Sequence, residues 1–260
     1  MSDFISDSKS NPILELGNIS KSFGHIDALI NASLSAYPGE VLSLVGDNGA
    51  GKSTLIKIIA GVYQIDSGII KINGQSVEFK NAAHAQILGV STVFQDLAMV
   101  ETLDVATNLY LGQPIRKGHI FVDRKKMYER TSTLINELGI KLPSVYVPIS
   151  VLSGGQRQAV AVARAVLQEG KVILMDEPTA ALGVREKNQV LDIIKQLRDR
   201  GKSIILISHD LDVVFNISNK IQVLRLGQVQ GIRKTNDTNR EEIVGLITGA
   251  ITGDELKNSE

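Results

Sequence analysis

A run of small and charged residues at positions 46–54, GDNGAGKST, holds three glycines, one lysine and two hydroxyl side chains. It follows the apolar run VLSLV at 41–45 and matches the spacing GxxxxGK[ST]. Glycines in such a loop let the backbone turn its N–H groups inward as a nest for an anion, and the next helix directs its positive end there. The run therefore predicts a cradle for the phosphates of a nucleotide. A glycine-rich turn without a ligand is the alternative, which the flanking strand and helix disfavour.

Individual roles in the cradle follow from the side chains. Lys52 supplies a positive charge for the β- and γ-phosphates, and Ser53 offers its hydroxyl to Mg²⁺. The remaining residues expected to bind the nucleotide are Gly46, Asn48, Gly49, Gly51 and Thr54.

Two carboxylates end a second apolar run, VILMDE at 172–177. Ligands of open α/β sheets bind beyond the carboxyl ends of the strands, so both side chains are expected near the cradle. Asp176 would hold Mg²⁺, and Glu177 would polarise the water that attacks the γ-phosphate, which is worth roughly 10²–10⁴ in rate. Acidic residues also end strands in solvated turns, but the pairing with the glycine-rich loop favours the catalytic interpretation.

His209 and Gln95 follow two further strand-like runs, SIILIS and VSTVF. A lone histidine is more often structural than catalytic, but His209 is expected at the sheet edge that carries Asp176 and Glu177. There it would bind the γ-phosphate and the group that positions the water. Gln95 would contact Mg²⁺ or water, and a plain capping amide is the alternative.

Strands and helices of an α/β fold are expected to position these residues. VILM and IILI are continuously apolar, as in strands buried on both faces of a parallel sheet. Strand runs alternate with helical patterns, which predicts βαβ units. The predicted strands cover 13–16, 41–45, 69–72, 90–94, 172–175, 203–208 and 221–226, and the predicted helices 52–61, 123–138, 154–168, 184–199 and 209–218.

The fold class is therefore α/β: a P-loop NTPase core with a mostly parallel sheet, an N-terminal antiparallel β subdomain and an inserted helical subdomain. Turn signals among the first 80 residues favour the antiparallel part, and a less apolar helical stretch over about 96–158 favours the insertion. We expect one domain over 12–250, with a disordered N-terminus at 1–11 and a flexible tail at 251–260.

Composition excludes several classes of function. Lys and Arg together number 28, as do Asp and Glu, so the formal net charge is zero. A balanced charge gives no indication of nucleic-acid binding. The absence of cysteine excludes disulfides and thiolate metal sites. The polar start MSDFISDSKSN is not a signal peptide, and no apolar run is long enough to span a bilayer.

LSGGQR at 152–157 is a second phosphate-binding candidate, because Ser153 is a good N-cap and the glycines expose backbone N–H groups at a helix start. With GDNGAGKST, Gln95, VILMDE and His209 in this order, the sequence resembles the ATP-binding cassette (ABC) ATPases over about residues 12–235. LSGGQ is close to diagnostic of these nucleotide-binding subunits of ABC transporters.

The resemblance implies a dimer in which two chains sandwich two ATP molecules head to tail. Each ATP would contact the glycine-rich loop of one chain and, on the other chain, residues Ser153, Gly154, Gly155 and Gln156. Phe23 would stack on adenine, or else belong to the core. One departure is Gly183 in EPTAALGVRE, where the family usually has Asp, so a side-chain contact across the dimer would be missing.

The resemblance also implies partners. Residues 96–112 would dock on an integral-membrane permease, which an extracytoplasmic solute-binding protein supplies with solute. TNLYLG at 107–112 and Gly183 are similar to ATPases of ribose-, xylose- and fructose-type importers. The chain would then be a peripheral protein on the cytoplasmic face of the cell membrane. It would work as a homodimer or beside another cassette, and would hydrolyse ATP to energise uptake of a small sugar.

Other functions remain open. An exporter or lipid-system cassette is the main alternative, and a soluble non-transport ABC ATPase is another. A chromosome or repair ATPase is disfavoured because no sustained heptads appear between the glycine-rich loop and LSGGQ. LSGGQ also disfavours a P-loop kinase.

Overall fold

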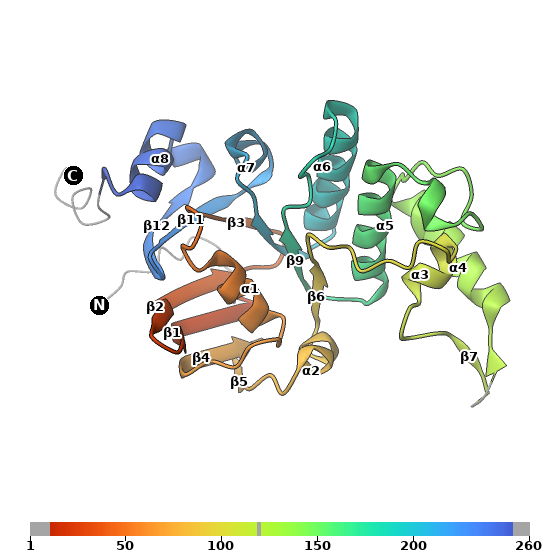
Figure 1. Cartoon of the computed structure of the whole chain (residues 1–260), viewed down its shortest axis with the longest axis horizontal. Coiled ribbons are helices and arrows are strands. Elements are labelled where there is room, and N and C mark those ends of the chain that lie inside the picture. The colour runs from red at the N-terminus through yellow and green to blue at the C-terminus, as the bar shows by residue number, and fades with distance from the viewer. Residues whose placement is uncertain (1–10, 119–120, 252–260) are drawn as a thin grey trace.

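A computed structural model describes residues 11–118 and 121–251, in which two packed sheets carry the helices (Figure 1). The predicted disordered N-terminus and flexible tail lie almost wholly outside these described residues. The smaller sheet is antiparallel, in the order β2-β1-β4-β5. Its strands are β1 Leu14–Phe23, β2 Ile26–Ala36, β4 Ser67–Ile72 and β5 Gln75–Val77.

The larger sheet has the order β12-β11-β3-β10-β9-β6. Its strands are β3 Val41–Val45, β6 Val90–Val93, β9 Val172–Asp176, β10 Ser203–Ile207, β11 Lys220–Arg225 and β12 Gln228–Lys234. All neighbours pair in parallel except β12, which is antiparallel to β11. The predicted fold class, a mostly parallel α/β sheet beside an antiparallel N-terminal sheet, is confirmed.

Helices cover both faces of this sheet (Figure 1). They are α1 Lys52–Ile59, α2 Ala82–Ile87, α3 Val105–Leu109, α4 Arg124–Glu137, α5 Gly154–Leu167, α6 Val184–Asp199, α7 Leu211–Ile217 and α8 Arg240–Thr248. Short 3-10 turns span Ile149–Val151 and Thr235–Asp237, and a hairpin pairs β7 Arg116–Lys117 with β8 Phe121–Val122. Among the described residues, no helix is long and apolar enough to cross a membrane.

Alternate residues of the central strands enter different cores, as the two-residue period of a strand requires. Ile173 and Met175 of β9 pack in one core with residues of α5 and α6. Val172 and Leu174 pack in the other, with α1 and the smaller sheet. The helix that follows GDNGAGKST and the helix that follows LSGGQ therefore lie on opposite faces of the larger sheet.

Several elements differ from the sequence-based expectation. The strand predicted over 13–16 continues to Phe23, because it pairs with β2 along its length. Strands β2 and β12 and helix α8 were not predicted. The helix predicted over 209–218 begins only at Leu211, because the Asp210 side chain caps it by accepting from the N–H groups of Asp212 and Val213. Strand β6 ends at Val93, so Gln95 lies two residues beyond it.

Candidate functional site

Four neighbouring strands bring the predicted site residues to one edge of the larger sheet. The glycine-rich loop follows β3, His209 follows β10, Asp176 ends β9 with Glu177 directly after it, and Gln95 follows β6. These strands are parallel neighbours in the order β3-β10-β9-β6, so their carboxyl ends open on the same side.

Two glycines of the loop have no room for a side chain. A Cβ on Gly46 would lie 2.1 Å from the carbonyl oxygen of Leu224, and one on Gly51 would lie 2.5 Å from that of Ala28. Both residues have positive φ, +154° at Gly46 and +102° at Gly51, which side chains disfavour. The loop thus packs its backbone tightly against β2 and β11, and this fits a nest that backbone N–H groups form around phosphate oxygens.

Lys52 is folded into this loop, with only 6% of its surface exposed. Its Nζ donates to the carbonyl oxygens of Gly46 and Asp47, both at 2.8 Å. Burial lowers the pKa of Lys52, while the carboxylates of Glu177, Asp47 and Asp176 oppose that shift. The Lys52 ammonium is thus desolvated and bound to the loop carbonyls, in a position to bind an anion that enters the loop.

Helix α1 begins at Lys52 with an uncapped end, because its N-cap residue Gly51 makes no side-chain hydrogen bond. The first N–H groups of a helix have no partner within it, so they remain for a ligand. Ser53 and Asn48 are exposed at this end and Thr54 is half-buried.

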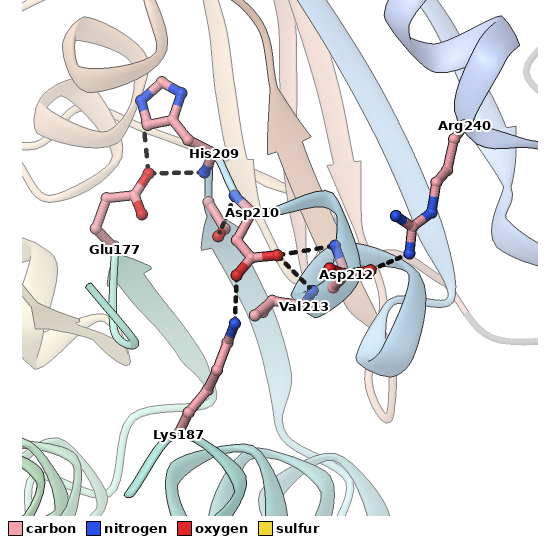
Figure 2. Close-up of polar contacts among 8 residues, drawn as sticks. Glu177, Lys187, His209, Asp210, Asp212, Val213 and Arg240 are labelled. Carbon is pink, nitrogen blue, oxygen red and sulfur yellow. Dashed lines mark hydrogen bonds and ion pairs between the residues drawn. The ribbon is translucent and has the colours of Figure 1, made fainter. Parts of the chain in front are cut away.

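The backbone and the side chain of Glu177 are both held by hydrogen bonds. Its backbone has a positive φ of +51°, and its N–H donates to the carbonyl oxygen of Ile207 at 3.0 Å. Its Oε1 accepts the backbone N–H of His209 at 2.9 Å, and Nε2 of His209 lies 3.5 Å from the same oxygen (Figure 2). Burial raises the pKa of Glu177, which His209 partly offsets.

Asp176 is the second carboxylate, at the last position of β9 and paired in register with Ile207. Burial raises the pKa of Asp176, and the positive charges of Lys52 and Lys57 oppose this. Two adjacent carboxylates with raised pKa values, both close enough to Lys52 for its charge to oppose the shift, are typical of a functional site.

Magnesium fits the donor set of this edge. No group of three or more His, Cys, Asp or Glu able to hold a metal occurs in 11–118 or 121–251. Mg²⁺ is commonly held by one or two carboxylates together with phosphates and water, rather than by a full protein cage. Asp176 with the exposed side chains of Ser53 and Gln95 is a set of this kind. The ladder between β6 and β9 ends at the pair Val93–Met175, so Gln95 follows the end of β6 on the side where Asp176 ends β9.

LSGGQ forms the start of α5, as predicted. Ser153 is its N-cap, and a capping box joins the Ser153 hydroxyl to the N–H of Gln156 and the Gln156 side chain to the N–H of Ser153. The amide of Gln156 also donates to the carbonyl oxygen of Lys141 at 3.0 Å. The Gln156 side chain therefore fixes the fold of the motif locally, a contact that sequence reasoning did not anticipate.

Glycines of LSGGQ face the first turn of α6 and the loop before it. A Cβ on Gly155 would lie 2.4 Å from Cβ and Cγ of Glu186, and one on Gly154 would lie 3.6 Å from Leu182. At Gly183, the carboxylate of Glu186 occupies the adjacent space, 2.6 Å from where a Cβ would stand.

Phe23 ends β1 with 42% of its surface exposed. Its ring meets Tyr63 edge-on, with centroids 5.1 Å apart, and Nζ of Lys21 lies 5.5 Å from its centroid. The contact between Phe23 and Tyr63 was not predicted, because the two residues are far apart in the sequence.

Comparison with known proteins decides the family. The model of the family described as ABC transporter matches residues 29–180, which include the glycine-rich loop, LSGGQ and both carboxylates. This chain belongs to the ABC transporter family. The predicted ATP-binding cassette is thereby confirmed, and the chain is an ATP-binding protein of the ABC ATPase class.

Several curated relatives match this chain over most of its length. The chain is 42% identical to the xylose/arabinose import ATP-binding protein XylG of Sulfolobus acidocaldarius, over 93% of this chain and 96% of the relative. It is 41% identical to the fructose import ATP-binding protein FrcA of Rhizobium meliloti, over 92% and 95%. The galactofuranose transporter ATP-binding protein YtfR of Escherichia coli K12 is 42% identical, but the match covers 91% of this chain and only 47% of that protein.

Solved structures agree with the cassette fold. The ADP conformation of MJ1267, an ATP-binding cassette of an ABC transporter, superposes with a TM-score of 0.80 at 27% identity, over 96% of this chain and all of that chain. MJ0796, a bacterial ABC transporter cassette solved as a dimer, superposes with a TM-score of 0.73 at 26% identity, over 85% of this chain and 98% of that one.

Proposed function

We propose that this chain is the ATP-hydrolysing subunit of an ABC importer that energises the uptake of a small sugar. The observation that carries the proposal is the identity of 41–42% over more than nine-tenths of the chain to cassettes named for xylose/arabinose and fructose import. TNLYLG and Gly183 point in the same direction.

Nucleotide binding would rest mainly on phosphates. The nest of Gly46, Gly49 and Gly51, with the uncapped start of α1, would surround the phosphate oxygens, while Lys52 turns its Nζ from the loop carbonyls toward the β- and γ-phosphates. Asn48 and Thr54 would complete the cradle. Phe23 would stack on adenine from the end of β1.

Ser53, Gln95 and Asp176 would hold Mg²⁺ between the glycine-rich loop and the ends of β6 and β9. When bound, the ion would neutralise charge on the phosphates. Asp176, whose burial disfavours its own ionisation, would gain a nearby positive charge that reverses this effect.

Glu177 would act as the general base for the attacking water. Its Oε1 is already held by the backbone of His209, so the carboxylate needs little reorientation. The His209 side chain, which is 53% exposed, would bind the γ-phosphate. Glu177 would take one proton from the water, and the water oxygen would attack the γ-phosphorus. The bond from that phosphorus to the bridging oxygen would break, giving ADP and phosphate.

A second copy would complete each site. LSGGQ starts a helix on the face of the sheet opposite α1, so Ser153, Gly154, Gly155 and Gln156 would bind a nucleotide held by a partner rather than one in this chain's own loop. The cassette MJ0796 is a dimer in its solved structure, which supports this arrangement.

Transport requires further partners. We infer a permease that docks on residues 96–112, within a helical subdomain over about 96–158 of the single domain at 12–250. An extracytoplasmic solute-binding protein would deliver the sugar, and the cassette would sit peripherally on the cytoplasmic face of the membrane.

Co-purification tests the transport assignment. The tagged chain would be isolated from gently solubilised membranes of its native host, and its partners identified by mass spectrometry. We expect a polytopic permease with a sugar-binding protein. Recovery of an exporter domain or ribosomal proteins instead would leave the ATPase chemistry intact and replace the importer by the exporter or soluble alternative.

A further inference from the structure

Lys187 and Asp210 form an ion pair between α6 and the turn that carries His209 (Figure 2). The Asp210 carboxylate is fully engaged, because Oδ2 accepts from Nζ of Lys187 while Oδ1 accepts from the N–H groups of Asp212 at 2.9 Å and Val213 at 3.3 Å. The hydrogen bond from Lys187 is the main reason that the pKa of Asp210 is lowered.

This pair lies one residue from the catalytic contact. Asp210 directly follows His209, whose N–H binds Oε1 of Glu177 (Figure 2). The N–H of Asp210 donates to Oγ of Ser208 at 3.1 Å, so residues 208–210 form one turn, and the peptide between Ser208 and His209 carries the N–H that binds Glu177. A displacement of Asp210 therefore shifts this turn and the His209 N–H with it. Lys187 therefore binds the turn whose backbone N–H holds the Glu177 carboxylate.

Helix α6 offers a fixed support for Lys187. The neighbouring residue, Glu186, packs against Gly155 so closely that no Cβ would fit there, and α6 also contributes Val190, Ile193 and Ile194 to the core it shares with α5. The first turn of α6 is thus anchored on LSGGQ on one side and joined to the His209 turn on the other.

Stability alone does not account for the pair. The side chains are 26% and 39% exposed, and ion pairs with this degree of exposure add little to folding free energy. A fixed geometry next to reacting groups has a larger effect, because small displacements of a catalytic group slow the chemical step.

We propose that Lys187 and Asp210 are positioning residues for the Glu177–His209 pair, and that their contact sets the rate of hydrolysis without contributing to ATP affinity. The inference rests on the proposed function, in which Glu177 is the general base.

Steady-state ATP hydrolysis by the purified full chain tests it with four variants. Lys187→Ala removes the pair, and Lys187→Arg restores a charged donor. Asp210→Asn keeps a good N-cap for α7 while removing the charge that binds Lys187. Lys195→Ala is the matched control, because Nζ of Lys195 also joins α6 to α7, through Asn216 at 2.7 Å, but away from the turn.

The expected result is a kcat about tenfold lower for Lys187→Ala and Asp210→Asn, with KM for ATP and thermal midpoint close to wild type, as for loss of an interaction that acts in the transition state. Lys187→Arg should recover most of the rate, and Lys195→Ala should match wild type. A kcat for Lys187→Ala within about twofold of wild type, or an equal loss in Lys195→Ala, would overturn the proposal.

Glu177→Gln measured in parallel separates the two levels of inference. If it hydrolyses ATP at the wild-type rate, the proposed role of Glu177 fails and the positioning role fails with it. If it is inactive while Lys187→Ala is normal, only the positioning role fails.

Discussion

The backbone N–H of His209 donates to Oε1 of Glu177 at 2.9 Å, while the imidazole Nε2 of the same residue lies 3.5 Å from that oxygen. The main chain of His209 thus orients the carboxylate, and its ring remains half in solvent. The two parts of one residue therefore serve different purposes, which substitution can separate.

His209→Ala keeps the backbone donor and removes the ring. We expect Glu177 to stay in place and the affinity for ATP to change little, while turnover falls by roughly 10²–10³-fold because the γ-phosphate loses one hydrogen-bond donor in the transition state. Turnover and nucleotide binding measured on the same preparation check this. Wild-type turnover would remove the ring from the mechanism.

Lys52→Ala should weaken ATP binding. A charge-assisted hydrogen bond is worth about 1.5–3 kcal/mol, which corresponds to a loss of roughly 10–150-fold in affinity. Isothermal titration with Mg-ATP measures it, with Lys195→Ala as a control that keeps the net charge equal. Unchanged affinity would mean that the backbone nest suffices without the ammonium.

The raised pKa of Glu177 predicts a pH-dependent stability difference between wild type and Glu177→Gln without nucleotide. Because burial favours the protonated form in the folded chain, the native state holds its proton to a higher pH than the unfolded state does, and stability falls as pH rises through that window. The penalty is absent below the ordinary glutamate value near 4.5 and complete above the folded pKa.

Glu177→Gln lacks this penalty, so it should unfold at a higher urea concentration than wild type at about pH 7.5, and the gap should close toward about pH 4, below the ordinary pKa of glutamate. Urea unfolding at several pH values measures the gap. A gap of constant size, or a less stable variant at neutral pH, would contradict buried-charge destabilisation.

Alanine at Gly46 should destabilise the fold more than alanine at Gly49. Both residues have positive φ, but only at Gly46 would a Cβ strike backbone, whereas nothing lies within 4 Å of one at Gly49. The backbone strain of a side chain is about 1–3 kcal/mol at either position, and the clash adds to it only at Gly46. The free energy of unfolding should therefore drop further in Gly46→Ala, by at least about 1 kcal/mol. Equal losses would show that the loop shifts away from Leu224 at no cost.

The sequence predicts the central strands and the sheet edge that carries the candidate site, because both depend on local signals. VILM and IILI are buried on both faces, and parallel pairing then forces Asp176, His209 and Gln95 to one edge. Strand β2 was missed although Ala32, Leu34 and Ala36 alternate with serines, because only every second residue is buried and Asn31 interrupts the pattern with a positive φ.

Contacts between distant residues carry no such local signal. Lys187 and Asp210 are 23 residues apart, and each alone resembles an ordinary surface charge. Similarly, the contact between Glu186 and Gly155 depends on how α5 packs against α6. Helix α3 was not predicted because its five residues are too few to show a helical period.

The hydrolysis rate of Glu177→Gln tests the account most directly. Purified wild type, Glu177→Gln and the surface control Glu129→Gln would be compared at saturating Mg-ATP, with ATP binding and molar mass measured on each. We predict that Glu177→Gln binds ATP, turns over roughly 10²–10⁴-fold more slowly and accumulates as a nucleotide-held dimer, while Glu129→Gln behaves as wild type. Turnover of Glu177→Gln near the wild-type rate would contradict the assignment of Glu177 as general base.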